Sequence, residues 1–280
     1  MKQKIIWIAS YPKSGNTWVR GFLISLLYTD KGTSNLKDFR RISQYPIKSQ
    51  FGTLVDDFKD ITKVKKFYHK TQDILNLNKK IKILKTHNAL VNLDGDNFSN
   101  TKNTLGVVHI VRDPRNVITS LKNYFSIPNY QKAKEFLFDE KRVIYGDFSK
   151  KEFPIATLLT SWKTHYISWM QVQNNYLLIK YENLLNNPDQ EFRKISNYFS
   201  KLLNKEFSET KIQNSIESNS FDNLKEQETR EGFGEFINNE NKQFFNLGPA
   251  NDWKNFLNKQ TKDEIESRFY REMKELKYIL

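Results

Sequence analysis

The amino-acid sequence predicts an α/β fold, in which helices flank a central parallel β-sheet. Short apolar runs at 5–9, 82–85, 107–111 and 177–181 are typical of buried strands, and segments with helical spacing of apolar residues lie between them. Strands that alternate with helices form parallel sheets, because each crossover helix packs on one face of the sheet. We therefore expect three layers: helices, sheet and helices.

Five segments have apolar residues near the helical period. We expect helices at 17–28, 114–125, 155–173, 188–200 and 261–276. Two of them begin with proline, which lacks the N–H group that the first helical turn leaves unpaired. The longer polar segments, at 30–80, 126–154 and 219–250, are candidates for loops that cover a substrate.

Length and composition favour one large core. The chain has 280 residues, of which 38% are hydrophobic and 14% aromatic, and no linker or repeat divides it, so we expect a single domain over 1–280. Cysteine is absent, which excludes disulfides and thiolate metal sites and fits a cytoplasmic protein. The apolar run near the amino terminus is too short for a signal peptide, and no stretch is long enough to span a bilayer.

A formal net charge of +13 would attract anionic ligands. The basic residues are spread along a chain rich in lysine and asparagine, and the densest run, at 63–66, is typical of a solvated face. The sequence therefore favours small anionic ligands over nucleic acid.

The first predicted strand leads directly into a turn that fits a phosphate site. Residues 10–18 read Ser-Tyr-Pro-Lys-Ser-Gly-Asn-Thr-Trp and precede a predicted helix. The backbone N–H groups of 14–17 and the helix dipole would face an anion, with Lys13 adding a charge and Ser14 and Thr17 their hydroxyls. By itself the segment is also compatible with an ordinary strand-to-helix turn. The Walker A pattern is absent, since the lysine precedes the glycine, which disfavours ATP-type phosphoryl transfer.

Two further elements stand at predicted strand ends. Arg112 follows the strand 107–111, and Ser120 lies about two helical turns later, so both can reach one anion, although a capping Arg and a buried Ser would fit equally well. Lys85-Thr86-His87 ends another strand. An imidazole, with an ordinary pKa of about 6.5, can accept the proton of an attacking hydroxyl near neutral pH. Lys85 and Lys13 can neutralise charge on a transferred group and its leaving oxygen.

Taken together, these elements resemble sulfotransferases that use PAPS (3′-phosphoadenosine 5′-phosphosulfate). The loop is similar to the family pattern Y-P-K-S-G-T-x-W, with Asn16 replacing a Thr; Arg112 and Ser120 match R-x-x-x-D/N-x-x-x-S; and 85–87 match the K-T-H of cytosolic-type and bacterial small-molecule members. Tyr181 opens a segment similar to Y-E-D/N-L, and Phe221 and Trp18 match positions that sandwich adenine. The resemblance implies a P-loop NTPase-like fold.

A last resemblance lies near the carboxyl terminus, where the family has R-K-G-x-x-G-D-W-K. Gly248 and the Asp-Trp-Lys at 252–254 are retained, but Asn246 and Leu247 replace the basic pair and Asn251 replaces a Gly. Two charge-assisted contacts, each worth about 1.5 to 3 kcal/mol when desolvated, are therefore expected to be missing. Lys242 and Arg230 are candidates to compensate.

The resemblance implies the following donor-binding residues: Lys13, Ser14, Gly15, Asn16, Thr17, Trp18, Arg112, Ser120, Tyr181, Phe221, Asn246, Leu247 and Gly248. It also implies in-line transfer of sulfuryl from PAPS to a hydroxyl or amine of a small acceptor, with PAP as product and no metal. His87 would be the base, Lys13 would assist the leaving group, and Lys85 would stabilise the sulfuryl. Ser120, besides holding the 3′-phosphate with Arg112, would restrain Lys13.

Two alternatives remain from the sequence: a P-loop nucleotide kinase or other phosphotransferase, and a catalytically silent nucleotide-binding protein. The acceptor is not defined by the sequence. The oligomeric state is also open, because the dimerisation pattern K-x-x-x-T-V-x-x-x-E of cytosolic members is not reproduced after Lys254.

Overall fold

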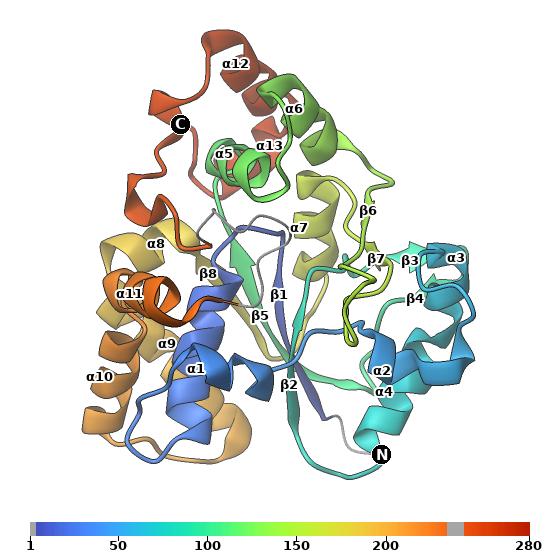
Figure 1. Ribbon diagram of the computed structural model, residues 1–280, viewed down its shortest axis with the longest axis vertical. Helices are drawn as coiled ribbons and strands as arrows, with labels where there is room; N and C mark the ends of the chain where they lie inside the picture. The colour runs from blue at the N-terminus through green and yellow to red at the C-terminus, as the bar shows by residue number, and fades with distance from the viewer. Residues whose placement is uncertain (1–3, 234–243) are drawn as a thin grey trace. The chain divides into compact units, whose positions relative to one another are not determined.

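The structure, a computed structural model, describes residues 4–233 and 244–280 (Figure 1). It divides into two compact units. The first unit comprises Met1–Tyr11, Ile42–Ile110 and Asp139–Leu178. The second comprises Pro12–Arg41, Val111–Phe138 and Ile179–Leu280. Each unit is thus assembled from three separate stretches of the chain. The expectation of a single domain over 1–280 stays a prediction.

A four-stranded sheet begins in the first unit. Its order is β2 (Lys82–Thr86), β1 (Ile5–Ser10), β5 (Thr104–Val111) and β8 (Tyr176–Lys180). β1 pairs in parallel with both β2 and β5. The chain passes from β1 to β2 on one side of β1 and later to β5 on its other side. In such sheets, ligands bind beyond the carboxyl ends of the strands where the order reverses. The predicted parallel α/β sheet is confirmed.

An aromatic core fixes one face of β1 in the first unit. Ile5, Trp7 and Ala9 alternate along the strand and point into the same buried cluster, since side chains of a strand alternate between faces. The Trp7 ring lies 5.4 Å from the ring of Tyr45 and 5.3 Å from that of Phe98. Short elements supply part of this core: α2 (Lys48–Phe51), α3 (Ile61–Val64), α4 (Tyr68–Asn76) and the 3-10 helices Gly52–Leu54 and Lys65–Phe67. Leu84 of β2, Val107 of β5 and Trp169 are among its other members.

The expected helix at 155–173 is only partly right. The first unit instead has a short strand, β7 (Thr157–Leu158), paired with β6 (Val143–Ile144), and then α7 (Trp162–Met170). α7 starts late because Ser161 caps it, accepting a hydrogen bond from the backbone N–H of Thr164 at 3.1 Å. A two-stranded ribbon of β3 (Asn92–Leu93) and β4 (Asp96–Asn97) completes this unit.

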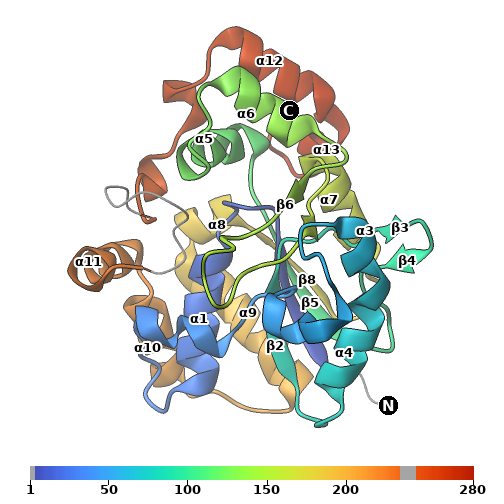
Figure 2. The same cartoon turned by 45° about the vertical axis from the view of Figure 1, so that its right-hand side comes forward.

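The second unit is mainly helical. It contains α1 (Asn16–Tyr28), α5 (Pro114–Tyr124), α6 (Tyr130–Phe138), α8 (Tyr181–Asn186), α9 (Pro188–Leu203), α10 (Glu209–Ser218), α11 (Phe221–Glu231), α12 (Lys259–Arg268), α13 (Tyr270–Glu275) and the 3-10 helices Leu36–Arg41, Gly248–Ala250 and Trp253–Asn255. α6 and α12 lie side by side in both views (Figures 1 and 2), and the Lys134–Glu264 ion pair joins them.

Two expectations for this unit need correction. The helix expected at 261–276 is broken at Phe269, which leaves the helical region at φ −116° and ψ 22° and packs its ring 5.1 Å from that of Phe138. Tyr181 begins α8, although the sequence placed it at the end of a strand.

In residues 4–233 and 244–280, no helix is sufficiently long and apolar to cross a membrane.

Candidate active site

The turn between β1 and α1 depends on glycine. Gly15 is the N-cap of α1 and has φ +99°, and a Cβ there would lie 2.6 Å from Cδ2 of Tyr181. Lys13 also has positive φ, at 66°. No described side chain caps α1, so its first turn presents N–H groups and the positive end of the helix dipole, the arrangement that binds phosphate.

A buried hydroxyl in the same turn is unsatisfied. Ser14 is fully buried, and its Oγ has no hydrogen-bond partner among the described residues. A buried hydroxyl without a partner costs about 1 to 3 kcal/mol, so such a group usually faces a ligand or water. Thr17, the second residue of α1, is also buried. The turn therefore fits an anion with hydrogen-bond acceptors.

Arg112 joins the turn to α5. Its Nη1 donates to the carbonyl oxygen of Lys13 at 2.8 Å and to Oγ of Ser120 at 3.3 Å. The guanidinium carbon also lies 4.1 Å from the centroid of the Tyr181 ring. The structure thus brings together four of the residues predicted to bind the donor, Lys13, Arg112, Ser120 and Tyr181, in the second unit.

The aromatic residues predicted to sandwich adenine have different neighbours. The Trp18 ring packs edge-on against Tyr181 at 6.1 Å and Phe192 at 5.5 Å. Phe221 lies against Gly248, where a Cβ would come within 2.3 Å of its ring, and Gly248 has φ +50°. Gly248 is therefore required by both backbone and packing. The sandwich itself stays a prediction.

In the C-terminal loop, the two residues that replace the basic pair of the family motif differ from Asn251 in burial. Asn246 is exposed and Leu247 half-buried. Of the proposed substitutes, Lys242 lies outside the described residues, and Arg230 faces Glu226 at 3.8 Å and Glu231 at 4.0 Å. Asn251, which the sequence marked only as a departure from Gly, is buried and bonds three residues of α5: Asn116, Thr119 and Ser120.

Two aromatic rings hold the Lys13 ammonium. Its Nζ lies 4.0 Å from the ring centroid of Phe244 and 4.6 Å from that of Tyr124. Cation–π contacts of this kind contribute about 0.5 to 2 kcal/mol. Phe244 and Tyr124 were not among the residues predicted from the sequence, where each is simply an aromatic residue close to a predicted phosphate motif.

The predicted base lies in the first unit, at the end of β2. Nδ1 of His87 is 2.7 Å from the backbone oxygen of Ser10 and 3.3 Å from its Oγ. Because a carbonyl oxygen only accepts, Nδ1 carries the proton and donates it, which leaves the lone pair of the neutral ring on Nε2. This tautomer is the one that a general base at Nε2 requires.

Lys85, also in the first unit, is buried. Its backbone N–H donates to the carbonyl oxygen of Ser43 at 2.9 Å, and its carbonyl oxygen accepts from the N–H of Tyr45 at 2.8 Å.

Two other histidines of the first unit are buried, His109 and His165. Burial lowers the pKa of His165 to about 3 and holds the pKa of His109 well below its ordinary value. Both rings are therefore neutral near pH 7, and neither is a candidate base.

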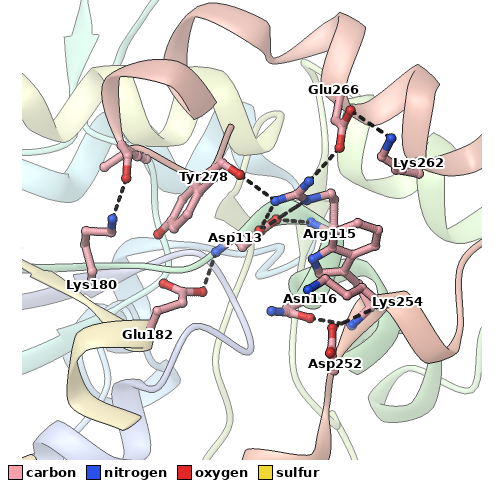
Figure 3. Close-up of polar contacts among 12 residues, drawn as sticks. Asp113, Arg115, Asn116, Lys180, Glu182, Asp252, Lys254, Lys262, Glu266 and Tyr278 are labelled. Carbon is pink, nitrogen blue, oxygen red and sulfur yellow. Dashed lines mark hydrogen bonds and ion pairs between the residues drawn. The ribbon is translucent and has the colours of Figure 1, made fainter. Parts of the chain in front are cut away.

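A polar network in the second unit surrounds Asp113 and Arg115, which follow Arg112 in the chain (Figure 3). Glu182 accepts from the N–H of Asp113 at 2.9 Å, which fixes the backbone next to Arg112. Asp113 in turn pairs with Arg115 at 2.6 Å, and Arg115 donates to the carbonyl oxygen of Tyr278 at 2.7 Å and pairs with Glu266 at 2.5 Å. Asp113 and Arg115 are two residues apart, but Glu182, Glu266 and Tyr278 are distant from them in the sequence, so no local pattern indicated these three partners.

The part of the chain that the structure describes contains no group of three or more His, Asp and Glu side chains that could hold a metal ion.

Comparisons with known proteins point to the family that the sequence motifs resemble. A family model described as "Sulfotransferase domain" matches residues 3–277. Cytosolic sulfotransferase 5 of Arabidopsis thaliana is 24% identical over 271 residues, covering 93% of this chain and 77% of that protein. Sulfotransferase 1 family member D1 of Mus musculus is 26% identical over 275 residues, covering 96% and 83%.

Two solved structures share the fold. Mouse sulfotransferase SULT7A1 complexed with PAP has a TM-score of 0.63 and 18% identity, covering 98% of this chain and 86% of that one. Retinol dehydratase in complex with androsterone and inactive cofactor PAP has a TM-score of 0.64 and 18% identity, covering 98% and 82%.

Proposed function

We propose that this chain, which belongs to the sulfotransferase family, transfers the sulfuryl group of PAPS to a hydroxyl or amine of a small acceptor and releases PAP. The observation that carries the proposal is the bonding of Arg112 to both the Lys13 carbonyl and Ser120, which unites the two predicted phosphate motifs. The solved relatives named with PAP support the same donor.

The donor is assigned to the second unit. Its 5′-phosphosulfate would lie at the turn 13–17, where the buried hydroxyl of Ser14 and the N–H groups of α1 offer donors. Arg112 and Ser120 would hold the 3′-phosphate, a charge-assisted contact that separates PAP from nucleotides lacking that group. Tyr181, stacked on the Arg112 guanidinium, would lie near the adenine.

The transfer needs one proton acceptor and two neutralising charges. The acceptor oxygen or nitrogen forms the new bond to sulfur while the bond from sulfur to the departing PAP oxygen breaks, and Nε2 of His87 takes the acceptor proton. Lys13 would neutralise the leaving oxygen, and Lys85 the transferred group. The tautomer fixed by the Ser10 carbonyl supports this role for His87.

For the acceptor, the proposal extends only to the class of small molecules. Retinol and androsterone are named with structures of retinol dehydratase, and both are small alcohols, which supports a hydroxylated acceptor of that size. The cytosolic relative in Arabidopsis supports a cytoplasmic location.

Calorimetric titration tests the donor. The protein is titrated with PAP, ADP and ATP, each with Mg²⁺ and with EDTA. We expect PAP to bind at least tenfold more tightly than ADP or ATP in either condition, a difference of about 1.4 kcal/mol. Preference for Mg-ATP would favour the kinase alternative. Absence of binding would indicate that the replacement of the basic pair at 246 and 247 has removed the site.

A further inference from the structure

Asn251 occupies a position where the related motif has Gly, and backbone geometry does not explain the difference. The residue has φ −77° and ψ 76°, which any amino acid adopts. Its side chain is only 6% exposed. The buried amide must therefore be explained by its contacts.

The orientation of the Asn251 amide follows from its neighbours. One side of the amide lies 3.0 Å from the carbonyl oxygen of Asn116. A carbonyl oxygen can only accept, so the atom facing it is the nitrogen Nδ2, and Oδ1 accepts from the Thr119 hydroxyl at 2.7 Å. The second N–H of Nδ2 is then directed at Oγ of Ser120, 3.2 Å away.

This arrangement determines what the Ser120 hydroxyl can do. Its oxygen has two lone pairs and one proton. Among the described residues, Nδ2 of Asn251 and Nη1 of Arg112 both donate to it, at 3.2 and 3.3 Å. With both lone pairs occupied, the hydroxyl has only its proton to offer, and a hydroxyl of this kind is a hydrogen-bond donor suited to an anion.

We propose that Asn251 is a positioning residue of the 3′-phosphate site, which orients the Ser120 hydroxyl as a donor to that phosphate. The inference rests on the proposed function. An uncharged side chain would then contribute to selection of the 3′-phosphate in a chain that has Asn246 and Leu247 in place of the basic pair. Asn251 itself acts through Ser120 and need not touch the nucleotide.

The alternative is that Asn251 has a purely structural role and only holds the C-terminal loop against α5. The chain offers a matched control for this role, because the backbone N–H of Trp253 donates to the side-chain oxygen of Asn116 at 2.8 Å. Asn116→Ala removes this tie but keeps the carbonyl that Asn251 uses. Loosening the loop should weaken PAP and adenosine 5′-phosphate, which lacks the 3′-phosphate, by the same factor.

The experiment measures Kd for PAP and for adenosine 5′-phosphate in the wild type and in Asn251→Gly, Asn251→Asp, Ser120→Ala, Asn116→Ala and the Asn251→Gly/Ser120→Ala double variant. The ratio of Kd for adenosine 5′-phosphate to Kd for PAP reports selection of the 3′-phosphate, and a lower ratio means weaker selection. We expect Asn251→Gly to lower it about three- to tenfold, the scale of one hydrogen bond. Asn251→Asp should lower it further, because a carboxylate would accept the Ser120 proton itself.

The double variant decides whether Asn251 acts through Ser120. In the Ser120→Ala background, Asn251→Gly should leave the ratio unchanged, since residues that act as a unit are not additive. An equal loss for both nucleotides in Asn251→Gly, or an undiminished effect on the ratio without Ser120, would overturn the proposal. A wild type with no preference for PAP would instead overturn the proposed function.

Discussion

The two units hold their predicted site residues by different means. In the second unit, the residues predicted to bind the donor contact one another: Arg112 bonds Lys13 and Ser120, and a Cβ at Gly15 would meet the ring of Tyr181. In the first unit, the His87 tautomer rests on the backbone oxygen of Ser10. Donor binding should therefore be sensitive to many substitutions, whereas the base should be sensitive mainly to its own replacement.

His87→Ala should separate the two functions most strongly. We expect turnover to fall at least a hundredfold, the usual scale for loss of general-base catalysis, while Kd for PAP stays within twofold. The measurement is steady-state sulfuryl transfer together with calorimetry. His69→Gln, on α4, is the control and should keep its turnover. Near-normal turnover of His87→Ala would remove the residue from the mechanism.

Gly15→Ala tests the interdependence in the second unit. A Cβ would lie 2.6 Å from the Tyr181 ring at φ +99°, and left-handed strain of about 1 to 2 kcal/mol adds to an overpacking cost of about 1 to 3 kcal/mol. We expect PAP affinity to fall about a hundredfold by calorimetry. Gly95→Ala has a similar φ of +92° but no atom within 4 Å, and PAP affinity should not change. Equal effects would show that general strain, not the Tyr181 contact, is responsible.

The first unit should lose stability in mild acid because of His165. Burial lowers its pKa to about 3, so below about pH 6.5 the unfolded chain binds a proton that the folded chain does not. The stabilisation is complete above pH 6.5 and is lost as the pH falls towards 3. Between pH 7.5 and 5, His165 alone should lower the free energy of unfolding in urea by about 2 kcal/mol. His109, whose pKa burial also lowers, adds a loss of the same sign. His165→Phe should reduce this difference; an unchanged pH dependence would contradict the assignment.

Restoring the basic pair should strengthen the donor site modestly. Asn246→Arg with Leu247→Lys adds two charges to a loop whose position 246 is exposed, so we expect a gain of about three- to tenfold in PAP affinity that shrinks at high salt. Gln131→Arg with Gln213→Lys adds the same charge on α6 and α10. If this control variant gained as much affinity, the effect would come from net charge alone.

Local sequence patterns predicted the parts of the site that depend on backbone and spacing. The strands, the Gly-containing turn, and the placement of Arg112 near Ser120 follow from residues within one element or its ends. Roles in catalysis and donor binding stay predictions from the family resemblance. The family itself and the parallel α/β fold are confirmed.

Contacts between distant segments were not predictable in the same way. Thr119 and Asn251 are 132 residues apart, and Arg115 reaches the backbone of Tyr278 across 163 residues. No periodicity reports such pairs. The first part of the expected helix at 155–173 was wrong for a related reason. Thr157 and Leu158 pair with Val143 and Ile144, and this pairing overrides the helical spacing of that part of the segment.

Ser10→Ala gives the smallest expected effect and the sharpest test of how the first unit holds its base. The substitution removes the hydroxyl at 3.3 Å from Nδ1 of His87 but keeps the carbonyl at 2.7 Å, which fixes the tautomer. Turnover should therefore fall less than about threefold, within the worth of one modest hydrogen bond, and PAP affinity should not change. A loss as large as that of His87→Ala would mean that the hydroxyl, and not the backbone, orients the imidazole. The base would then depend on a neighbouring side chain, as the donor residues of the second unit do, and the contrast between the two units would disappear.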